Sequence, residues 1–412
     1  MATKMSQADL GVLEPETYAN GNPTTFGLPL EAYKYLREEE PVSLHTFKDD
    51  PLLLDEVYVI SRHEDIVRVD KDPETFAADR GVVNYWAFAP LGEAVGAPAM
   101  LTMDGERHRE NRRVVSRGFT PKVLKDLEAK FRSYAIEVIE PALAKGEAFD
   151  FITEVAHVMP MQALGDVLGV PEADRPKFFH WVDQFAAPFD TRITPNFEAV
   201  GQAIMDLYDY ALELEELRRR EPGDNVMSKL AEAHMSEGEV KGNVALLASG
   251  AAESTRTSLG HGLHELMRRP DQMAWLRERA DDIPMTVAQE IVRISSPFTH
   301  LCRTVTKDVE LHGVELHEGD NVAMLFAAGN FDPDAFDDPN EFDVSRSPNP
   351  HLSFGRGPHS CLGKHVAALE IKVLLEELLQ RTTDIQPAGP ISYIRDAYSR
   401  GVYELPVTMT TA

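Results

Sequence analysis

Cysteine is scarce in this chain of 412 residues, which contains only Cys302 and Cys361. Two cysteines cannot build the disulfide framework of a small secreted domain, so the composition favours a reducing compartment. Apolar runs are short as well, and none approaches the roughly 20 residues that a membrane-spanning helix needs. The segment Met1–Leu10 carries no apolar stretch of the kind found in secretory signals. We therefore expect a cytoplasmic protein without a membrane anchor.

Positive charge is also in deficit, with 41 Lys and Arg against 68 Asp and Glu, a formal net charge of −27. This balance argues against nucleic acid as a partner, because binding of phosphates needs a net basic face. One short segment runs against the trend and gathers Arg107, Arg109, Arg112, Arg113, Arg117, Lys122 and Lys125. Two interpretations stay open for it: a docking surface for an acidic protein, or a solvated helix face without a partner.

Apolar residues make up 43% of the chain, enough for a large packed core. Helical periodicity predicts amphipathic helices over Leu30–Glu39, Val123–Ala142, Met159–Leu168 and Val200–Arg220. The more continuously apolar stretch from Asn243 towards Met267 predicts one long helix buried on nearly all sides. Alternating residues between Thr304 and Phe326 predict a small sheet, and Val57–Ile60 a short strand. We predict a mainly α fold with small β-sheets, organised as an irregular segment over residues 1–20 and a single domain over 21–412.

The segment Phe354–Gly363 is the most informative part of the sequence. It places Cys361 in a glycine-rich turn that leads directly into a helical pattern beginning at Lys364. Backbone N–H groups and the positive end of that helix would stabilise a thiolate and lower the pKa of the thiol, as suits a metal ligand. The glycines at 355, 357 and 363 would let the backbone approach a large flat group. A buried structural cysteine is the alternative.

The pattern F-G-x-G-x-H-x-C-x-G in this segment resembles the heme-thiolate loop of the cytochromes P450. The resemblance implies a single prism-shaped domain with a long central helix over the heme, and Cys361 as the axial ligand of heme b (iron protoporphyrin IX). It also implies a soluble bacterial-type monooxygenase that inserts one atom of O2 into its substrate. Electrons would come from a separate ferredoxin or flavodoxin with its reductase, docking at Arg109, Arg113, Arg117 and Lys364.

Further motifs follow the same resemblance. Glu290 and Arg293 resemble the family's E-x-x-R pair, and Arg346 the third member of its network, which would fasten the cysteine loop through directional ion pairs. Four basic residues resemble the ligands of the two heme propionates: His108, Arg112, Arg303 and His359. Cys302, beside one of them, is expected to be a buried thiol without a role.

The segment Gly250–Thr255 resembles the oxygen-activating part of the family's long helix, with serine in place of the usual threonine. The resemblance implies that Glu253 and Ser254 deliver the protons that oxygen activation needs, with Thr255 as a possible substitute. Two other functions stay open. One is a peroxide-driven hydroxylase, which the departure from the family pattern motivates. The other is a heme-binding sensor without catalysis, against which the retained acid and alcohol of this segment speak.

Candidate substrate contacts are apolar and aromatic, which suits a hydrophobic molecule. We expect a terpenoid or steroid-like substrate first and a small aromatic second. The resemblance places the following residues in the pocket, with His300 as one polar anchor unless it is a satisfied core histidine: Tyr85, Trp86, Phe88, Val244, Leu247, Ala248, Phe298, Thr299, His300 and Val402.

Overall fold

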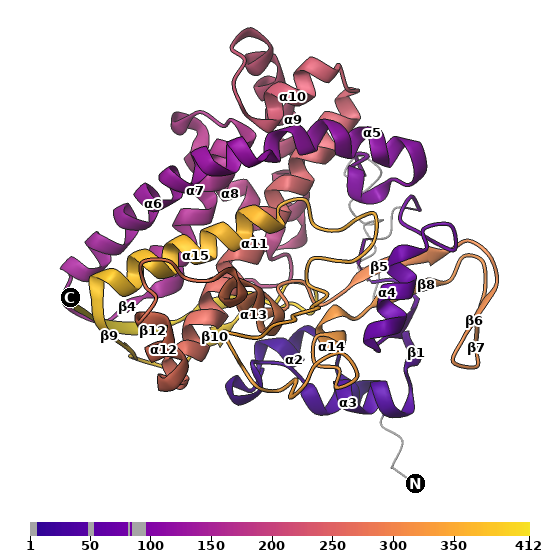
Figure 1. Cartoon of the computed structure of the whole chain (residues 1–412). Helices are drawn as coiled ribbons and strands as arrows, with labels where there is room; N and C mark the ends of the chain where they lie inside the picture. The colour runs from indigo at the N-terminus through magenta and orange to yellow at the C-terminus, as the bar shows by residue number, and fades with distance from the viewer. Residues whose placement is uncertain (1–5, 48–52, 81–82, 85–95) are drawn as a thin grey trace.

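The computed structural model describes residues 6–47, 53–80, 83–84 and 96–412, and helices dominate it (Figure 1). The shorter helices of the N-terminal part come first: α1 Gln7–Leu10, α2 Pro15–Ala19, α3 Leu30–Glu39, α4 His63–Lys71 and α5 Gly105–Ser116. The central helices are α6 Pro121–Ala144, α7 Val158–Leu168, α8 Arg175–Ala186, α9 Phe197–Arg220, α10 Val226–Ala233 and α11 Glu237–Arg268. The chain continues with α12 Pro270–Arg277, α13 Met285–Ser295, α14 Phe326–Gly329 and α15 Lys364–Arg381.

Among the described residues, the strands form one five-stranded sheet and three smaller ones. The large sheet has the order β1-β2-β8-β5-β3, with β2 and β8 parallel and the other neighbours antiparallel. Its strands are β1 Val42–Thr46, β2 Glu56–Ile60, β3 Phe76–Ala77, β5 Leu301–Val305 and β8 Asn321–Met324. The others are β4 Phe149–Asp150, β9 Thr382–Pro387 and β12 Pro406–Thr411 in one sheet, and the hairpins β6 Val309–Leu311 with β7 Val314–Leu316 and β10 Ser392–Tyr393 with β11 Val402–Glu404.

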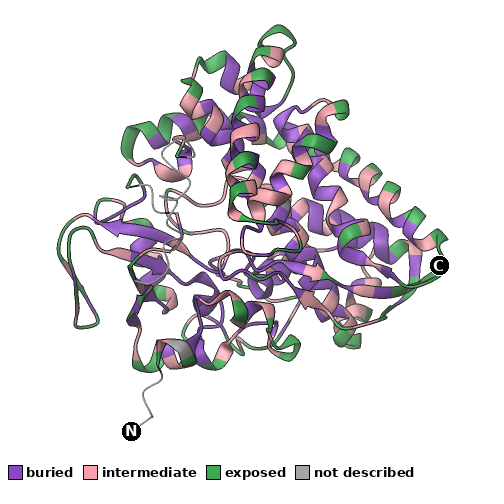
Figure 2. Ribbon diagram, turned by 180° about the vertical axis from the view of Figure 1, so that it is seen from behind, coloured by how far each residue is buried: buried purple, intermediate pink, exposed green. Residues whose placement is uncertain are grey.

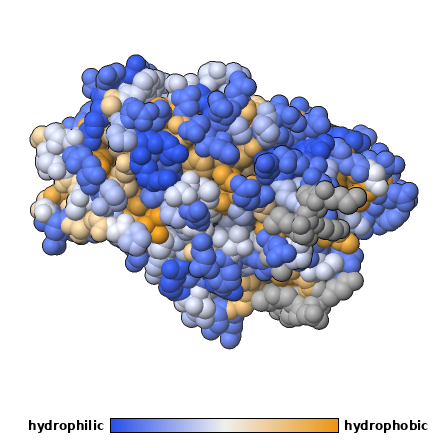
Figure 3. Space-filling model, turned by 90° about the horizontal axis from the view of Figure 1, so that it is seen from below, coloured by the Kyte–Doolittle hydropathy of each residue, from blue (hydrophilic) through white to orange (hydrophobic). Residues whose placement is uncertain are grey.

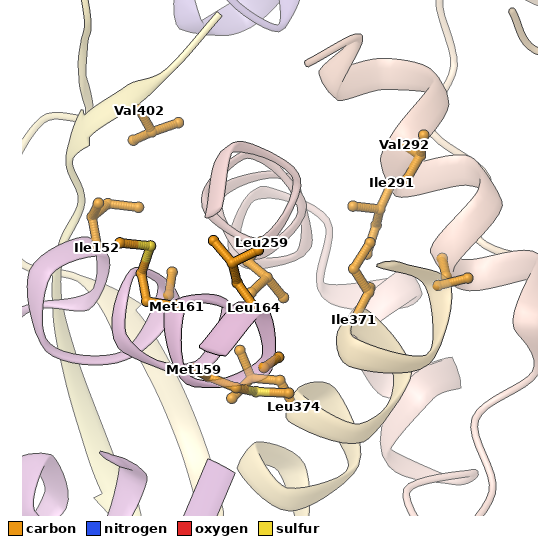
Figure 4. Close-up of a cluster of buried hydrophobic side chains, with 14 of the residues drawn as sticks. Ile152, Met159, Met161, Leu164, Leu259, Ile291, Val292, Ile371, Leu374 and Val402 are labelled. Atoms are coloured by element: carbon orange, nitrogen blue, oxygen red, sulfur yellow. The ribbon is translucent and has the colours of Figure 1, made fainter. Parts of the chain in front are cut away.

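Helix α11 runs through the middle of the molecule, and its neighbours pack around it. In Figure 4, Leu259 of α11 lies among Leu164 of α7, Ile291 of α13 and Ile371 of α15. Burial of such side chains stabilises the fold by about 1.5–3 kcal/mol each. Figure 2 shows the buried residues gathered on the inward sides of the helices. The core is therefore built around the helix that carries Glu253.

The long elements agree with the sequence prediction. Helix α3 has the predicted bounds, and α6, α7 and α9 contain the predicted segments. The segment Thr304–Phe326, predicted as a small sheet, contains the end of β5 and all of β6, β7 and β8, and of these β5 and β8 belong to the large sheet. The segment over residues 1–20 differs, because it contains α1 and α2. Ser6 caps α1 through Asp9, and the Tyr18 hydroxyl at the end of α2 hydrogen-bonds to Tyr33 at 3.0 Å. These contacts hold the two short helices in place. The helices themselves are too short to show a helical period of apolar residues in the sequence.

The surface is mixed in character. Figure 3 shows a face on which hydrophilic residues predominate and hydrophobic residues are scattered among them. Within the described ranges, no helix combines the length and the apolar character required to cross a bilayer.

Candidate active site

The segment Phe354–Gly363 forms a tight loop directly before α15. The N–H of Cys361 donates to the carbonyl oxygen of Phe354 at 2.7 Å, and the N–H of Ser360 donates to Gly357 at 3.0 Å. Gly355 has a φ of +66°, a left-handed conformation that favours glycine. The loop thus places the thiol of Cys361 beside the N-terminus of α15, as the sequence predicts.

The pKa of the Cys361 thiol does not behave as the sequence suggests. Burial raises it, and this outweighs the opposing effects of the Gly363 N–H, the Arg112 and Lys364 charges and the Lys364 N–H. The protein alone therefore does not hold a thiolate at neutral pH. A bound metal cation would, because coordination deprotonates a thiol outright.

A cavity of about 480 Å³ lies between α11 and the cysteine loop. Its size is typical of sites for small molecules and cofactors. Cys361 lines it on one side, and Gly250 and Glu253 of α11 line it on the other. Most other lining residues are apolar, among them Met100, Leu164, Phe185, Leu247 and Phe298.

The four predicted propionate ligands, far apart in sequence, all line this cavity together with Cys361. Arg112 donates to the carbonyl oxygen of Ser360 at 2.6 Å, which fastens α5 to the cysteine loop. The rings of His108 and His359 lie with their centroids 4.2 Å apart. Nε2 of His108 is buried and has no hydrogen-bond partner among the described atoms. Burial and the neighbouring charges of His359 and Arg112 lower the pKa of His108 to about 4.

This arrangement fits heme. An anionic propionate would supply the partner that Nε2 of His108 lacks, and an anion beside the ring would raise its pKa. The described residues contain no group of three or more His, Cys, Asp or Glu side chains that could hold a metal ion. In heme, the porphyrin would hold the iron, and Cys361 would supply a thiolate ligand to it.

The predicted ion-pair network exists and is buried. Arg293 donates to both oxygens of Glu290 at 2.8 Å, and Nε of Arg346 donates to Oε1 of Glu290 at 3.3 Å. Arg293 also donates to the carbonyl oxygens of Asn330, Pro339 and Glu341. The network therefore holds the irregular chain that leads into the cysteine loop.

Two asparagines that the sequence analysis did not single out complete this arrangement. Asn349 donates to Glu290 at 3.0 Å, and Oδ1 of Asn330 accepts from the N–H of Leu352 at 2.6 Å. Both lie in irregular chain, where no period marks them. The only available signal is their position between the E-x-x-R pair and the cysteine.

The predicted proton donors on α11 line the cavity, and each already has a partner. Glu253 forms an ion pair with Arg256 and accepts from the Thr257 hydroxyl at 3.1 Å. The Ser254 hydroxyl donates to the carbonyl oxygen of Gly250 at 2.7 Å. The Thr255 hydroxyl hydrogen-bonds to Glu370 of α15, a buried acid that sequence reasoning missed and whose pKa is raised to about 8 by burial.

The structure divides the predicted substrate residues into three groups: those that line the cavity, those outside the described residues, and those buried elsewhere. Leu247 and Phe298 line the cavity, whereas Tyr85, Trp86 and Phe88 lie outside the described residues. Five others are buried and are not among the described residues that line the cavity: Val244, Ala248, Thr299, His300 and Val402. Thr299 hydrogen-bonds to Nδ1 of His300 at 2.8 Å, so this histidine has a partner inside the protein.

Comparison with known proteins agrees with this geometry. The family model described as cytochrome P450 matches residues 55–387. A steroid C26-monooxygenase of Mycolicibacterium smegmatis is 33% identical over 93% of this chain and 91% of its own length. A methyl-branched lipid omega-hydroxylase of Mycobacterium tuberculosis is 32% identical over 92% of this chain and 90% of its own. Among solved structures, cytochrome P450 CYP268A2 of Mycobacterium marinum in complex with pseudoionone has a TM-score of 0.89 and 31% identity, covering 99% of this chain and 100% of that one.

The chain belongs to the cytochrome P450 family. It has the P450 fold and is a monooxygenase, an enzyme class that uses heme iron to activate O2.

Proposed function

We propose that this monooxygenase hydroxylates a hydrophobic small molecule, with a terpenoid or steroid-like compound first and a small aromatic second. The observation that carries the proposal is the cavity above Cys361. Its lining from α7, α8 and α11 is mostly apolar, with Leu164, Phe185 and Leu247 as examples. Such a lining binds a substrate through the area removed from water rather than through charge.

The relatives support this order of substrates. Two of them are named for a steroid and for methyl-branched lipids, and one structural neighbour holds pseudoionone. Heme b, held by Cys361 with His108, Arg112, Arg303 and His359 at its propionates, would supply the oxygen chemistry. The protein's own part is to orient the substrate, exclude water and deliver protons.

The experiment is a titration of the ferric enzyme with steroids, terpenoids and small aromatics, followed in the Soret band. A substrate that displaces the axial water shifts this band, so we expect saturable shifts with steroids or terpenoids at the lowest concentrations. Product analysis after turnover with a ferredoxin system and O2 then identifies the hydroxylated carbon. Tight binding by charged, polar compounds alone would contradict the proposal.

Proton delivery by Glu253 and Ser254, with Thr255 as a substitute, is part of the proposal. The variants Glu253→Gln, Ser254→Ala and Thr255→Ala should form less product per NADH consumed and release more peroxide. Unchanged coupling in all three variants would remove the relay.

A second function is favoured by one specific observation. Glu253 and Ser254 are both engaged, by Arg256 and by the Gly250 carbonyl, so neither hydroxyl nor carboxylate is free to move a proton without breaking a contact. A peroxide-driven hydroxylase would not need this relay. Turnover with hydrogen peroxide that matches turnover with a ferredoxin or flavodoxin system would support this alternative.

A further inference from the structure

Asp70, near the end of α4, connects two parts of the heme site. Its Oδ2 accepts from the N–H of Arg356 at 2.6 Å and from the N–H of Gly357 at 2.8 Å, both in the cysteine loop. Its Oδ1 accepts from Nη2 of Arg303 at 3.4 Å. The two carboxylate oxygens therefore serve different groups: one holds the loop, and the other faces a predicted propionate ligand.

The backbones of α4 and the loop also touch at this point. A Cβ built on Gly357 would lie 1.7 Å from the carbonyl oxygen of Asp70, so only glycine fits there. This close approach gives the loop's second glycine a structural reason. Because the two backbones lie this close, the carboxylate of Asp70 is within hydrogen-bonding distance of the loop N–H groups.

The charge of Asp70 is unusual for its position. The residue lies on the buried face of α4 with Ile66 and Val69, its exposure is 4%, and it lines the cavity. Burying a carboxylate is costly unless hydrogen bonds and a counter-charge compensate it. Arg303 supplies that charge: burial lowers the pKa of Arg303, and Asp70 and Asp104 oppose this effect.

We propose that Asp70 is a positioning residue that holds the cysteine loop and Arg303 in one arrangement, and that its negative charge lowers the heme reduction potential. The proposal rests on heme binding at Cys361 and not on the identity of the substrate. With heme bound in this cavity, a carboxylate in the lining would disfavour the more negative ferrous state, and it would also compete with a propionate for Arg303.

The distinct roles of the two oxygens allow the two effects to be separated. In Asp70→Asn, the amide oxygen can still accept from both loop N–H groups, while its NH₂ faces the donor Arg303 and the charge is lost. In Asp70→Ala, both the loop contacts and the charge are lost. The matched control is Asp65→Asn on the same helix, because Asp65 is half of a pair with His312 at 2.7 Å and does not line the cavity.

Two properties of the heme-loaded protein are measured: the reduction potential by spectroelectrochemistry, and the conversion of the reduced carbon monoxide complex from its band near 450 nm to about 420 nm. We expect both Asp70 variants to shift the reduction equilibrium toward ferrous by roughly three- to tenfold. Conversion to the 420 nm form should be several-fold faster in Asp70→Ala, and unchanged in Asp70→Asn and Asp65→Asn.

Each part can be overturned separately. Reduction equilibria of Asp70→Asn within twofold of the unsubstituted enzyme would remove the electrostatic role. Equal conversion rates in Asp70→Ala and Asp70→Asn would remove the positioning role. If Asp70→Ala does not fold, Asp70→Glu replaces it, because the longer side chain displaces the carboxylate oxygens from the loop amides but keeps the charge. We then expect faster conversion to the 420 nm form with an unshifted reduction potential. An unchanged conversion rate in Asp70→Glu would again remove the positioning role. Failure of any proposed substrate to bind would leave these readouts unaffected.

Discussion

At the scale of single residues, burial changes the protonation state of two carboxyl groups in this protein. Glu370 of α15 and Asp396 of the loop before β11 are both buried, and burial raises the pKa of each to about 8. Neither has a cation as its main partner, so both are neutral acids at physiological pH. Glu370 lies against Thr255 and lines the cavity, which makes it a hydrogen-bonding group and not a charge in the candidate site.

The neutral state of Glu370 predicts how stability depends on pH. Its ordinary pKa is 4.5, so the unfolded chain releases this proton at lower pH than the folded protein does. Protonated Glu370 therefore makes its full contribution to the free energy of unfolding below about pH 4.5. This contribution is lost as the pH rises towards 8, at about 1.4 kcal/mol per pH unit. We expect Glu370→Gln to gain stability relative to the unsubstituted enzyme as the pH of urea unfolding is raised from 5 to 8.

The exposed residue Asp384 provides the control for this experiment. Asp384→Asn removes a carboxyl group from the surface and is measured alongside for comparison. A pH profile of Glu370→Gln that runs parallel to that of the unsubstituted enzyme would show that Glu370 is ionised in the folded protein.

The ion pair of Glu253 and Arg256 predicts a second effect at this scale. Both side chains are largely buried, so loss of one partner leaves an uncompensated charge. Glu253→Gln should lower the free energy of unfolding by about 3 kcal/mol. The double variant with Arg256→Met should lose less than the sum of the two single variants, as a double-mutant cycle in urea measures. Additive losses would indicate that the pair contributes nothing to stability.

At the scale of elements, Gly242 and Gly250, two of the glycines of α11, have different surroundings. A Cβ on Gly242 would lie 2.3 Å from the carbonyl oxygen of Pro98, whereas a Cβ on Gly250 would meet nothing within 4 Å. The first glycine lets α11 approach the chain around Pro98, next to residues that line the cavity. The second carries only the usual entropic cost of glycine in a helix.

These surroundings predict opposite effects for the same substitution. Gly242→Ala should lower stability by about 1–3 kcal/mol, because backbone atoms must move. Gly250→Ala should raise it by up to about 1 kcal/mol, because alanine favours the helix. Thermal unfolding of the two variants measures both effects. Equal shifts of the melting temperature would contradict the packing of α11 against Pro98.

The helices and loops also show which structural features could be predicted from the sequence. Long periodic helices such as α6 and α9, and the contiguous loop around Cys361, carry their signal within a few neighbouring residues. Asp70 and Glu370 carry none, since their roles depend on Arg303 and Thr255, which lie far away in sequence. The sequence also contains no signal that identifies the apolar residues of the cavity. Val244 and Leu247 lie on the same helix, yet only Leu247 lines the cavity, and no pattern distinguishes a core residue from a pocket residue.

At the scale of the whole molecule, the net charge of −27 opposes the local charge beside the cysteine loop. Arg109 and Arg117 are engaged in ion pairs with Glu106 and Glu232. Arg113 and Lys364 are exposed and form no ion pair within the described part of the chain. The contact of Arg112 with Ser360 places α5 beside the loop, so an acidic electron donor that approaches Cys361 would meet positive charge on this small area.

The net negative charge and the local positive area together predict how salt would affect association with an acidic ferredoxin, if one is the electron donor as the sequence analysis expects. At low ionic strength the long-range repulsion between two acidic proteins slows association, and at high ionic strength the short-range attraction is lost. We expect the association rate constant, measured by stopped-flow reduction, to pass through a maximum between these limits. Arg113→Glu should lower that maximum several-fold, whereas Lys241→Glu on α11, outside the basic segment, should change it little. A rate constant that rises with salt throughout would mean that the positive area beside Cys361 does not guide the donor.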